Sequence, residues 1–175
     1  MFKTIAIIAS IITLTACSSI VDSADQIAGV GVIKQTTADF DGAQIISVSP
    51  NHLFNANAGL MGVQSMLGAK WSSNAPDLVA IQLTHNGMGD RYPIYTGLSI
   101  NVDGAINHYD AQRSTVIIPL TVFESMLTAK TCRLRIEQLN KYEDASCSDR
   151  RITGGKSTAI NSFDQMLVKI KAYKK

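Results

Sequence analysis

TCRLRIEQL, Thr131–Leu139, is the stretch that decides the fold class. Its residues alternate between two kinds: Cys132, Leu134 and Ile136 on one side of an extended chain, and Arg133, Arg135 and Glu137 on the other. This alternation predicts a half-buried β-strand, because successive side chains of a strand point to opposite faces. We expect its partner strand at about residues 145–152.

Other short strands are expected earlier in the chain, separated by turn residues. They cover about residues 27–33 (weakened by two glycines), 43–48, 77–84, 92–102 and 115–120. Pro50 and Asn51 are expected to end the second of these strands. Asp103-Gly104 is the strongest hairpin signal, because this dipeptide tolerates the positive φ angles of a two-residue turn. The pattern predicts a mainly antiparallel sheet.

Two helices are expected to pack on that sheet. Thr121 and Glu124 have the spacing of a capping box for a short helix over about 121–129, and Ser162 and Gln165 have it for a C-terminal helix over about 162–173. The second helix carries one apolar stripe: Phe163, Met166, Leu167, Ile170 and Tyr173. The fold class is therefore α+β, a mainly antiparallel β-sheet packed by these two helices.

Residues 51–75 are apolar and rich in glycine but have no clear period. They fit a helix from about Ala56 to Leu67, or a loop that folds over the core, and a membrane-dipping segment is a further alternative. Trp71 is expected to be a core residue and not a ligand platform.

The N-terminus resembles an export signal. Lys3 precedes an apolar run from Ile5 to Leu14, which is too short for a permanent membrane span of about 20 residues. A positive start, a short apolar run and small residues after it are typical of a secretory signal peptide. The alternative is a buried N-terminal strand or helix of the fold.

Leu14-Thr15-Ala16-Cys17 resembles the lipobox of bacterial lipoproteins, an aliphatic residue and two small residues before a cysteine. The resemblance implies that residues 1–16 are removed and that Cys17 carries a diacylglyceryl group and an N-terminal acyl chain. Such an anchor holds strongly, since each buried methylene contributes about 0.8 kcal/mol. Ser18, after the cysteine, implies sorting to the outer membrane.

The resemblance also organises the rest of the chain. Removal of residues 1–16 from the 175-residue chain leaves 159 residues, enough for one domain with a core. We expect a lipidated tether over 17–26 and a single globular domain over 27–175. From about Asp77 to Tyr173, the layout resembles uncharacterised bacterial envelope proteins, which implies a compact antiparallel sheet with helices but indicates no particular activity.

With Cys17 lipidated, Cys132 and Cys147 remain as a pair. Exported proteins meet an oxidising compartment, so we expect a disulfide between them; two free buried thiols are the alternative. If the two face each other across an antiparallel pair, the midpoint lies between Leu139 and Asn140, and Asn140-Lys141 is a suitable turn.

Several classes of site are disfavoured. The chain has 16 basic and 14 acidic residues, unlike a basic nucleic-acid binder. Gly154-Gly155-Lys156-Ser157 is similar to the end of a P-loop, but that motif needs glycine where Arg150 stands, and the expected compartment lacks nucleotides. We therefore expect neither nucleic acid nor nucleotide as a partner.

Catalytic and metal motifs are also missing from the sequence. His52, His85 and His108 have no zinc-site spacing, and no G-x-S-x-G motif frames a serine nucleophile. The segment 103–110, with His108 near Asp103 and Asp110, is expected to be a polar hairpin loop. Arg133 and Arg135, with Glu137, Asp149, Arg150 and Arg151 nearby, are expected to form a solvated ion-pair face; an anion or glycan site is the alternative.

These features predict a lipoprotein anchored to the periplasmic face of the outer membrane, with a non-catalytic binding or scaffolding role. Its partners would be the membrane, through the lipid anchor, and an envelope protein. We expect no catalytic residues, no cofactor and no metal. The alternatives are a small-ligand or glycan-binding lipoprotein, and an envelope hydrolase whose site is assembled from distant residues.

Overall fold

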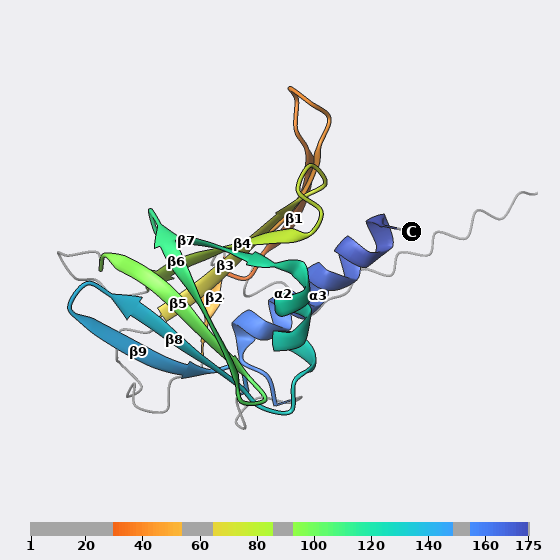
Figure 1. Ribbon diagram of the computed structural model, residues 1–175. Helices are drawn as coiled ribbons and strands as arrows, with labels where there is room; N and C mark the ends of the chain where they lie inside the picture. Colours follow the sequence, from red (N-terminus) through yellow and green to blue (C-terminus); the bar gives the residue numbers. More distant parts are fainter. Residues whose placement is uncertain (1–29, 54–64, 86–92, 149–154, 175) are drawn as a thin grey trace, which may run out of the picture.

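A computed structural model describes residues 30–53, 65–85, 93–148 and 155–174. Nine strands form one sheet in the order β1-β2-β3-β4-β7-β6-β5-β8-β9, and every neighbouring pair is antiparallel. The sheet curves into a half-barrel (Figure 1). The expected α+β class with a mainly antiparallel sheet is confirmed at this level. Among the described residues, no helix has the length and apolar character needed to cross a membrane.

The strands have these bounds: β1 Ile33–Thr37, β2 Gln44–His52, β3 Ser65–Ser72, β4 Leu78–His85, β5 Tyr95–Val102, β6 Ala105–Gln112, β7 Thr115–Pro119, β8 Cys132–Gln138 and β9 Lys141–Ser146. The strands predicted over 43–48, 77–84, 92–102 and 115–120 correspond to β2, β4, β5 and β7. Of the strand predicted over 27–33, residues 27–29 lie outside the described residues; residues 30–32 are not in a strand, and β1 starts at Ile33. Strand β6 replaces the loop expected over 103–110.

Two-residue turns connect β5, β6 and β7. Asp103 and Gly104 have φ angles of 49° and 92°, so the Asp-Gly hairpin is confirmed. Arg113 and Ser114 make a second turn of the same kind with φ angles of 49° and 65°. No glycine, asparagine or aspartate marks this second turn, which explains why the sequence did not reveal it or the strand before it.

The hairpin of β8 and β9 differs from its prediction in where the second strand lies. Gln138 pairs with Lys141 and Arg133 pairs with Ser146, so the pairing is centred between Leu139 and Asn140 as expected. The turn residues are Leu139 and Asn140 and not Asn140-Lys141. The partner strand predicted at 145–152 overlaps β9 only at 145–146, because the tight turn lets pairing begin at Lys141; its residues 149–152 lie outside the described residues.

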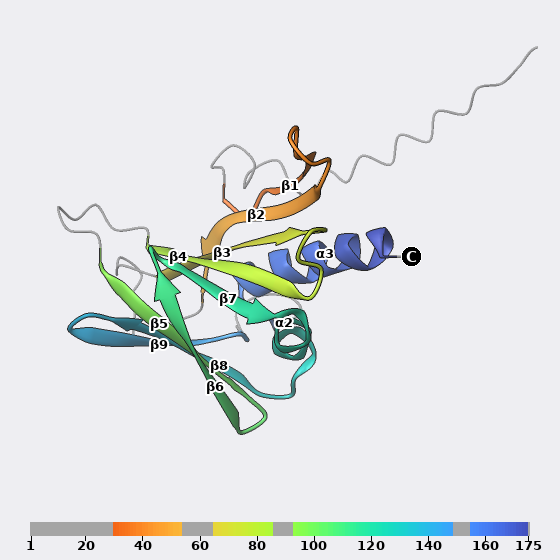
Figure 2. The ribbon, with the colours of Figure 1, turned by 45° about the horizontal axis from the view of Figure 1, so that its top comes forward.

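The two helices are α2, Leu120–Thr128, and α3, Thr158–Tyr173. Neither expected capping box forms. Pro119 is the N-cap of α2, so Thr121 already lies inside the helix. Helix α3 begins four residues before Ser162, whose hydroxyl donates to the Thr158 carbonyl at 3.0 Å. Helix α3 lies against β2, and α2 lies beside β7 (Figure 2).

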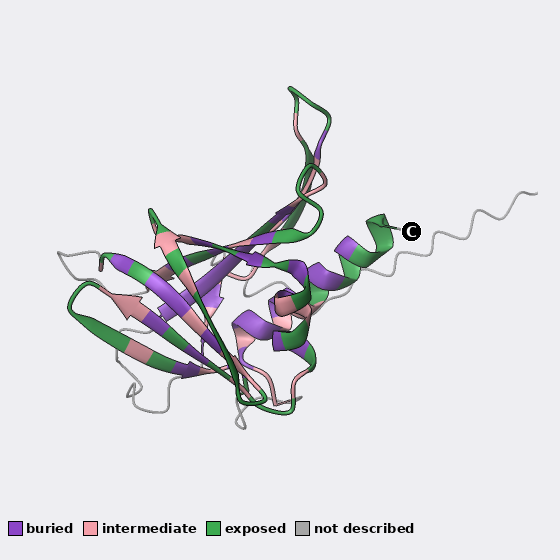
Figure 3. Ribbon diagram, in the orientation of Figure 1, coloured by how far each residue is buried: buried purple, intermediate pink, exposed green. Residues whose placement is uncertain are grey.

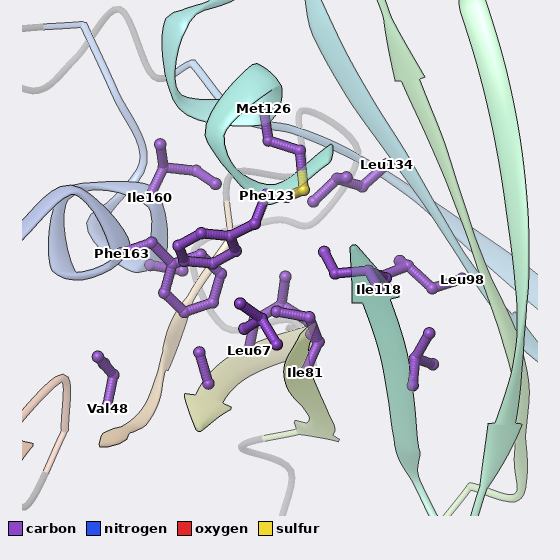
Figure 4. Packing of buried hydrophobic residues seen from close by; sticks show 14 of the residues in the cluster. Val48, Leu67, Ile81, Leu98, Ile118, Phe123, Met126, Leu134, Ile160 and Phe163 are labelled. Carbon is purple, nitrogen blue, oxygen red and sulfur yellow. The ribbon is translucent and has the colours of Figure 1, made fainter. Parts of the chain in front are cut away.

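The core lies between the inner face of the sheet and the helices. Its completely buried members include Ile46, Leu67, Ile81, Leu98, Ile100, Ile118, Phe123, Ile136, Phe163 and Ile170. The rings of Phe123 and Phe163 join α2 to α3 with centroids 5.3 Å apart (Figure 4). Trp71 is a core residue, as expected, and its indole N–H donates to the Pro76 carbonyl at 3.0 Å. Exposed positions follow β6 and β9 (Figure 3).

Strands β2 and β3 correct the expectations for the first half. Pro50 does not end β2, because a register shift between Val48 and Asn51 accommodates it. Gly68 lies opposite, and a Cβ there would be 3.3 Å from the Pro50 ring. The helix considered from Ala56 to Leu67 was wrong at Ser65–Leu67, which belongs to β3. Its other residues, 56–64, lie outside the described residues.

Candidate functional site

The two cysteines expected to pair are neighbours at the open end of the β8–β9 hairpin. Their sulfur atoms lie at disulfide distance, with the Cα atoms 5.4 Å apart, within the range that a disulfide requires. The Cys147 N–H donates to the Cys132 carbonyl at 3.2 Å, and the Ser157 N–H donates to the Cys147 carbonyl at 2.8 Å. The pair therefore connects the hairpin to the start of α3. Cys17 lies outside the described residues.

The side chains that alternate with the core on β5, β6, β8 and β9 form a polar surface, which we call the outer polar face. Its members are Ser99, His108, Asp110, Arg133, Arg135, Glu137, Tyr142 and Asp144. The strand register sets His108, Ser99, Arg135 and Asp144 in one row across the four strands. Residues distant in the sequence thus become neighbours.

His108 is at the centre of one half of this face. Its Nδ1 lies 3.1 Å from the Ser99 hydroxyl and 3.2 Å from the Glu137 carboxylate, and its Nε2 lies 3.2 Å from the Asp110 carboxylate. A Cβ at position 97 would be only 2.7 Å from the His108 ring. Gly97 therefore leaves room for the imidazole beside β5.

The same residues resemble a serine-hydrolase triad in composition but not in hydrogen bonding. The Ser99 hydroxyl donates to the Glu137 carboxylate at 2.7 Å. A triad requires the serine proton to pass to the histidine, which an acid on the far side orients. The Ser99 proton is therefore directed to Glu137 in this arrangement, and His108 lies beside the same carboxylate.

Arg135 organises the other half of the face. Its guanidinium makes two hydrogen bonds to Asp144, of 2.7 and 3.0 Å, and lies 4.1 Å above the centre of the Tyr142 ring. The hydrogen bond from Arg135 lowers the pKa of Asp144, and the bond to Asp144 raises the pKa of Arg135. The expected ion-pair face exists here, with Asp144 as the partner; Asp149, Arg150 and Arg151 lie outside the described residues.

A second polar group lies on the inner side of the half-barrel. The Ser65 N–H and hydroxyl both donate to the Glu143 carboxylate, the N–H at 3.3 Å. This contact joins β3 to β9 across the open side of the sheet. Burial, and then the charge of Glu143, raise the pKa of Tyr95 to about 12. The Tyr95 hydroxyl is buried and has no hydrogen-bond partner among the described residues.

The structure does not bring the three histidines together. His52 ends β2 opposite Met66, His85 ends β4 opposite Ser65, and His108 lies on the outer polar face. Within the described ranges, no three His, Cys, Asp or Glu side chains are arranged to hold a metal ion.

The segment similar to a P-loop has a structural role in the part that is described. The Lys156 ammonium donates to the Leu127 carbonyl at 2.9 Å and forms an ion pair with Asp164. These contacts attach the start of α3 to the end of α2. The Lys156 ammonium is therefore engaged in contacts within the fold.

Comparison of the chain with protein-family models, with curated proteins and with solved structures finds no match. Sequence reasoning found Arg133, Arg135 and Glu137 through their alternation. It missed Ser99, Gly97 and Asp144, whose place on the face depends on strand register between distant segments.

Proposed function

We propose that the protein is a bacterial lipoprotein, acylated at Cys17 and anchored to the periplasmic face of the outer membrane, with a non-catalytic binding or scaffolding role. The observation that carries this proposal is the pair Cys132–Cys147 at disulfide distance. Disulfides persist in oxidising compartments, which the lipobox-like start also implies. The two observations come from opposite ends of the chain and support the same location.

The outer polar face supports the binding role. Its hydrogen bonds and ion pairs fix Ser99, His108, Arg135 and Asp144 in place. A surface that is ordered before a partner arrives loses little conformational freedom on binding. The direction of the Ser99 hydrogen bond supports recognition and not hydrolysis.

Metabolic labelling tests the anchor. Cells that express the full chain, or the Cys17→Ser variant, are grown with a radioactive or clickable palmitate. The parent protein is expected to carry the label and to be recovered in the membrane fraction. The Cys17→Ser variant is expected to carry no label and to leave the membrane fraction. Equal labelling of both proteins would refute acylation at Cys17. Non-reducing peptide mapping of the same material is expected to recover Cys132 joined to Cys147.

A second candidate is a small polar ligand bound at the inner side of the half-barrel. The buried Tyr95 hydroxyl favours it, since a buried donor without a partner is costly unless something accepts its hydrogen bond. A sugar library measured by thermal shift, with Tyr95→Phe as the comparison, tests this candidate. A ligand that stabilises the parent chain and the variant equally would contradict it.

A further inference from the structure

The sheet separates between β6 and β7. Only Ala111 pairs with Val116 and Gln112 with Thr115 in that ladder, whereas β6 pairs with β5 from Ala105 to Asp110. Figures 1 and 2 both show β6 and β7 diverging from their shared turn. Residues 105–109 therefore have β5 as their single strand partner within the described chain.

The register identifies which backbone groups of β6 are left open. The two-residue turn at Asp103-Gly104 makes Val102 and Ala105 a hydrogen-bonded pair, and such pairs recur at every second residue of an antiparallel ladder. The N–H and C=O groups of Ile106 and His108 consequently point away from β5. No backbone hydrogen bond between described residues reaches these groups from another element.

The side chains on this stretch do not protect it. Natural edge strands are commonly guarded by charged residues, lysine above all. The outermost strands follow that rule, with Lys34 on β1 and Lys141 on β9. The stretch of β6 instead exposes 69% of Ile106. Beyond it, the Asp110 side chain is 91% exposed, and Glu137 lies near His108.

We propose that the open edge of β6 (residues 105–109) accepts an extended, basic segment of a partner protein as an added antiparallel strand. Added strands gain affinity from main-chain hydrogen bonds and specificity from alternate side chains. A lysine or arginine would lie opposite Asp110, and an apolar residue four positions later would lie opposite Ile106. This inference rests on the proposed binding role and names its partner class.

Charge favours this occupant over a second copy of the chain. Pairing two β6 edges around a two-fold axis would bring both His108 clusters together, each with Asp110 and Glu137. Like charges placed opposite each other across an interface are unfavourable. A basic segment meets the same carboxylates with the opposite charge.

Synthetic peptides test the proposal on the full chain. The probe is acetyl-Thr-Val-Thr-Lys-Thr-Val-Thr-Val-Thr-amide, which places lysine opposite Asp110 and valine opposite His108 and Ile106. One comparison peptide carries glutamate in place of lysine, and another is N-methylated at the sixth and eighth residues, whose N–H groups would face β6. The lysine peptide is expected to bind at least ~10-fold more tightly than either, because each comparison removes charge pairing or main-chain hydrogen bonds.

Two variants locate the binding. Ile106→Pro removes an N–H that faces away from β5, which an edge strand tolerates, and it is expected to weaken binding at least ~10-fold. Gln35→Pro is the matched control on β1. The hydrogen bonds from Ala38 N–H to Ala43 O and from Ser49 N–H to Val32 O show that the even-numbered residues of β1 bond to β2. The Gln35 N–H therefore faces away from β2, as the Ile106 N–H faces away from β5. This control is expected to bind like the parent chain.

Three results would overturn the inference: equal binding of all three peptides, equal losses in both proline variants, or self-association that Ile106→Pro abolishes. If Ile106→Pro does not fold, the comparison of the peptides on the parent chain still decides. Acylation of Cys17 is measured on the same preparation. Peptide binding by a protein that is not acylated would support the binding site on β6 and refute only the lipid anchor at Cys17.

Discussion

The hairpins β8–β9 and β6–β7 differ in how completely they pair. The first keeps its ladder from Arg133–Ser146 to Gln138–Lys141 and has the cysteine pair just beyond its open end. The second loses its ladder after two pairs. Cross-strand contacts and core side chains hold β8–β9, whereas residues 105–109 of β6 pair with β5 alone among the described strands. The difference shows that one sheet can combine a fully paired hairpin with an open backbone edge.

The largest expected effect compares two isoleucines, one on each hairpin. Ile136 of β8 is completely buried, and Ile106 of β6 is 69% exposed. Ile136→Ala is expected to lower the free energy of unfolding by about 2–5 kcal/mol, since it leaves a cavity. Ile106→Ala is expected to change it by less than about 0.5 kcal/mol. Urea unfolding of both variants checks this, and similar losses would contradict the assigned faces.

The cysteine pair is the next largest contribution. Its sequence separation of 15 residues corresponds to about 3 kcal/mol of stabilisation in the chain-entropy treatment. The double variant Cys132→Ser with Cys147→Ser is expected to lose that amount in chemical denaturation. Treatment of the parent chain with a reductant should reproduce the loss. A parent chain that is indifferent to reductant would show that the thiols are not joined.

The turn of the β6–β7 hairpin is expected to be suboptimal. Ser114 has a φ of 65°, a conformation that costs a residue with a Cβ about 1–2 kcal/mol. Ser114→Gly is therefore expected to raise the melting temperature slightly, by a net stabilisation of about 0.5–1 kcal/mol. Gly104→Ala, at a φ of 92°, serves as the opposite change and should destabilise. Equal signs for the two variants would contradict the turn geometry.

The smallest effect is electrostatic and belongs to β8–β9. The hydrogen bond from Arg135 lowers the pKa of Asp144 below its ordinary value. A carboxylate with a lowered pKa contributes stability that is present above its unfolded pKa and is lost as pH falls through its folded pKa. Asp144→Asn should therefore make stability less dependent on pH in acid. Denaturation midpoints of the parent chain and of the variant at neutral and acid pH measure this dependence. If the midpoint shifts between the two pH values by the same amount in both proteins, the Arg135–Asp144 pair does not contribute to it.

Local patterns predicted much of the second half of the chain. Three elements could be predicted from their own residues alone: the alternating strand Cys132–Gln138, the Asp103-Gly104 turn and the last helix with its apolar stripe. The large apolar side chain of Trp71 was likewise predicted to lie in the core, and it does.

The rest depended on contacts that a single segment does not encode. The sequence of β6 shows no apolar alternation because nearly all of its side chains are exposed. The Arg113-Ser114 turn that follows uses residues that seldom adopt positive φ. Pro50 normally ends a strand, but the register shift in β2 accommodates it. The cluster at His108 needs β5, β6 and β8 to be aligned, so only tertiary structure could place Ser99 and Glu137 beside it.

Amide hydrogen exchange, resolved by residue, tests the open edge of β6 most directly. The N–H groups of Asn107 and Tyr109 face β5, whereas those of Ile106 and His108 face away from it. The expected result is alternation along β6: slow exchange at Asn107 and Tyr109, fast exchange at Ile106 and His108. Equal protection at all four amides in the free protein would contradict the open edge and, with it, the proposed strand addition.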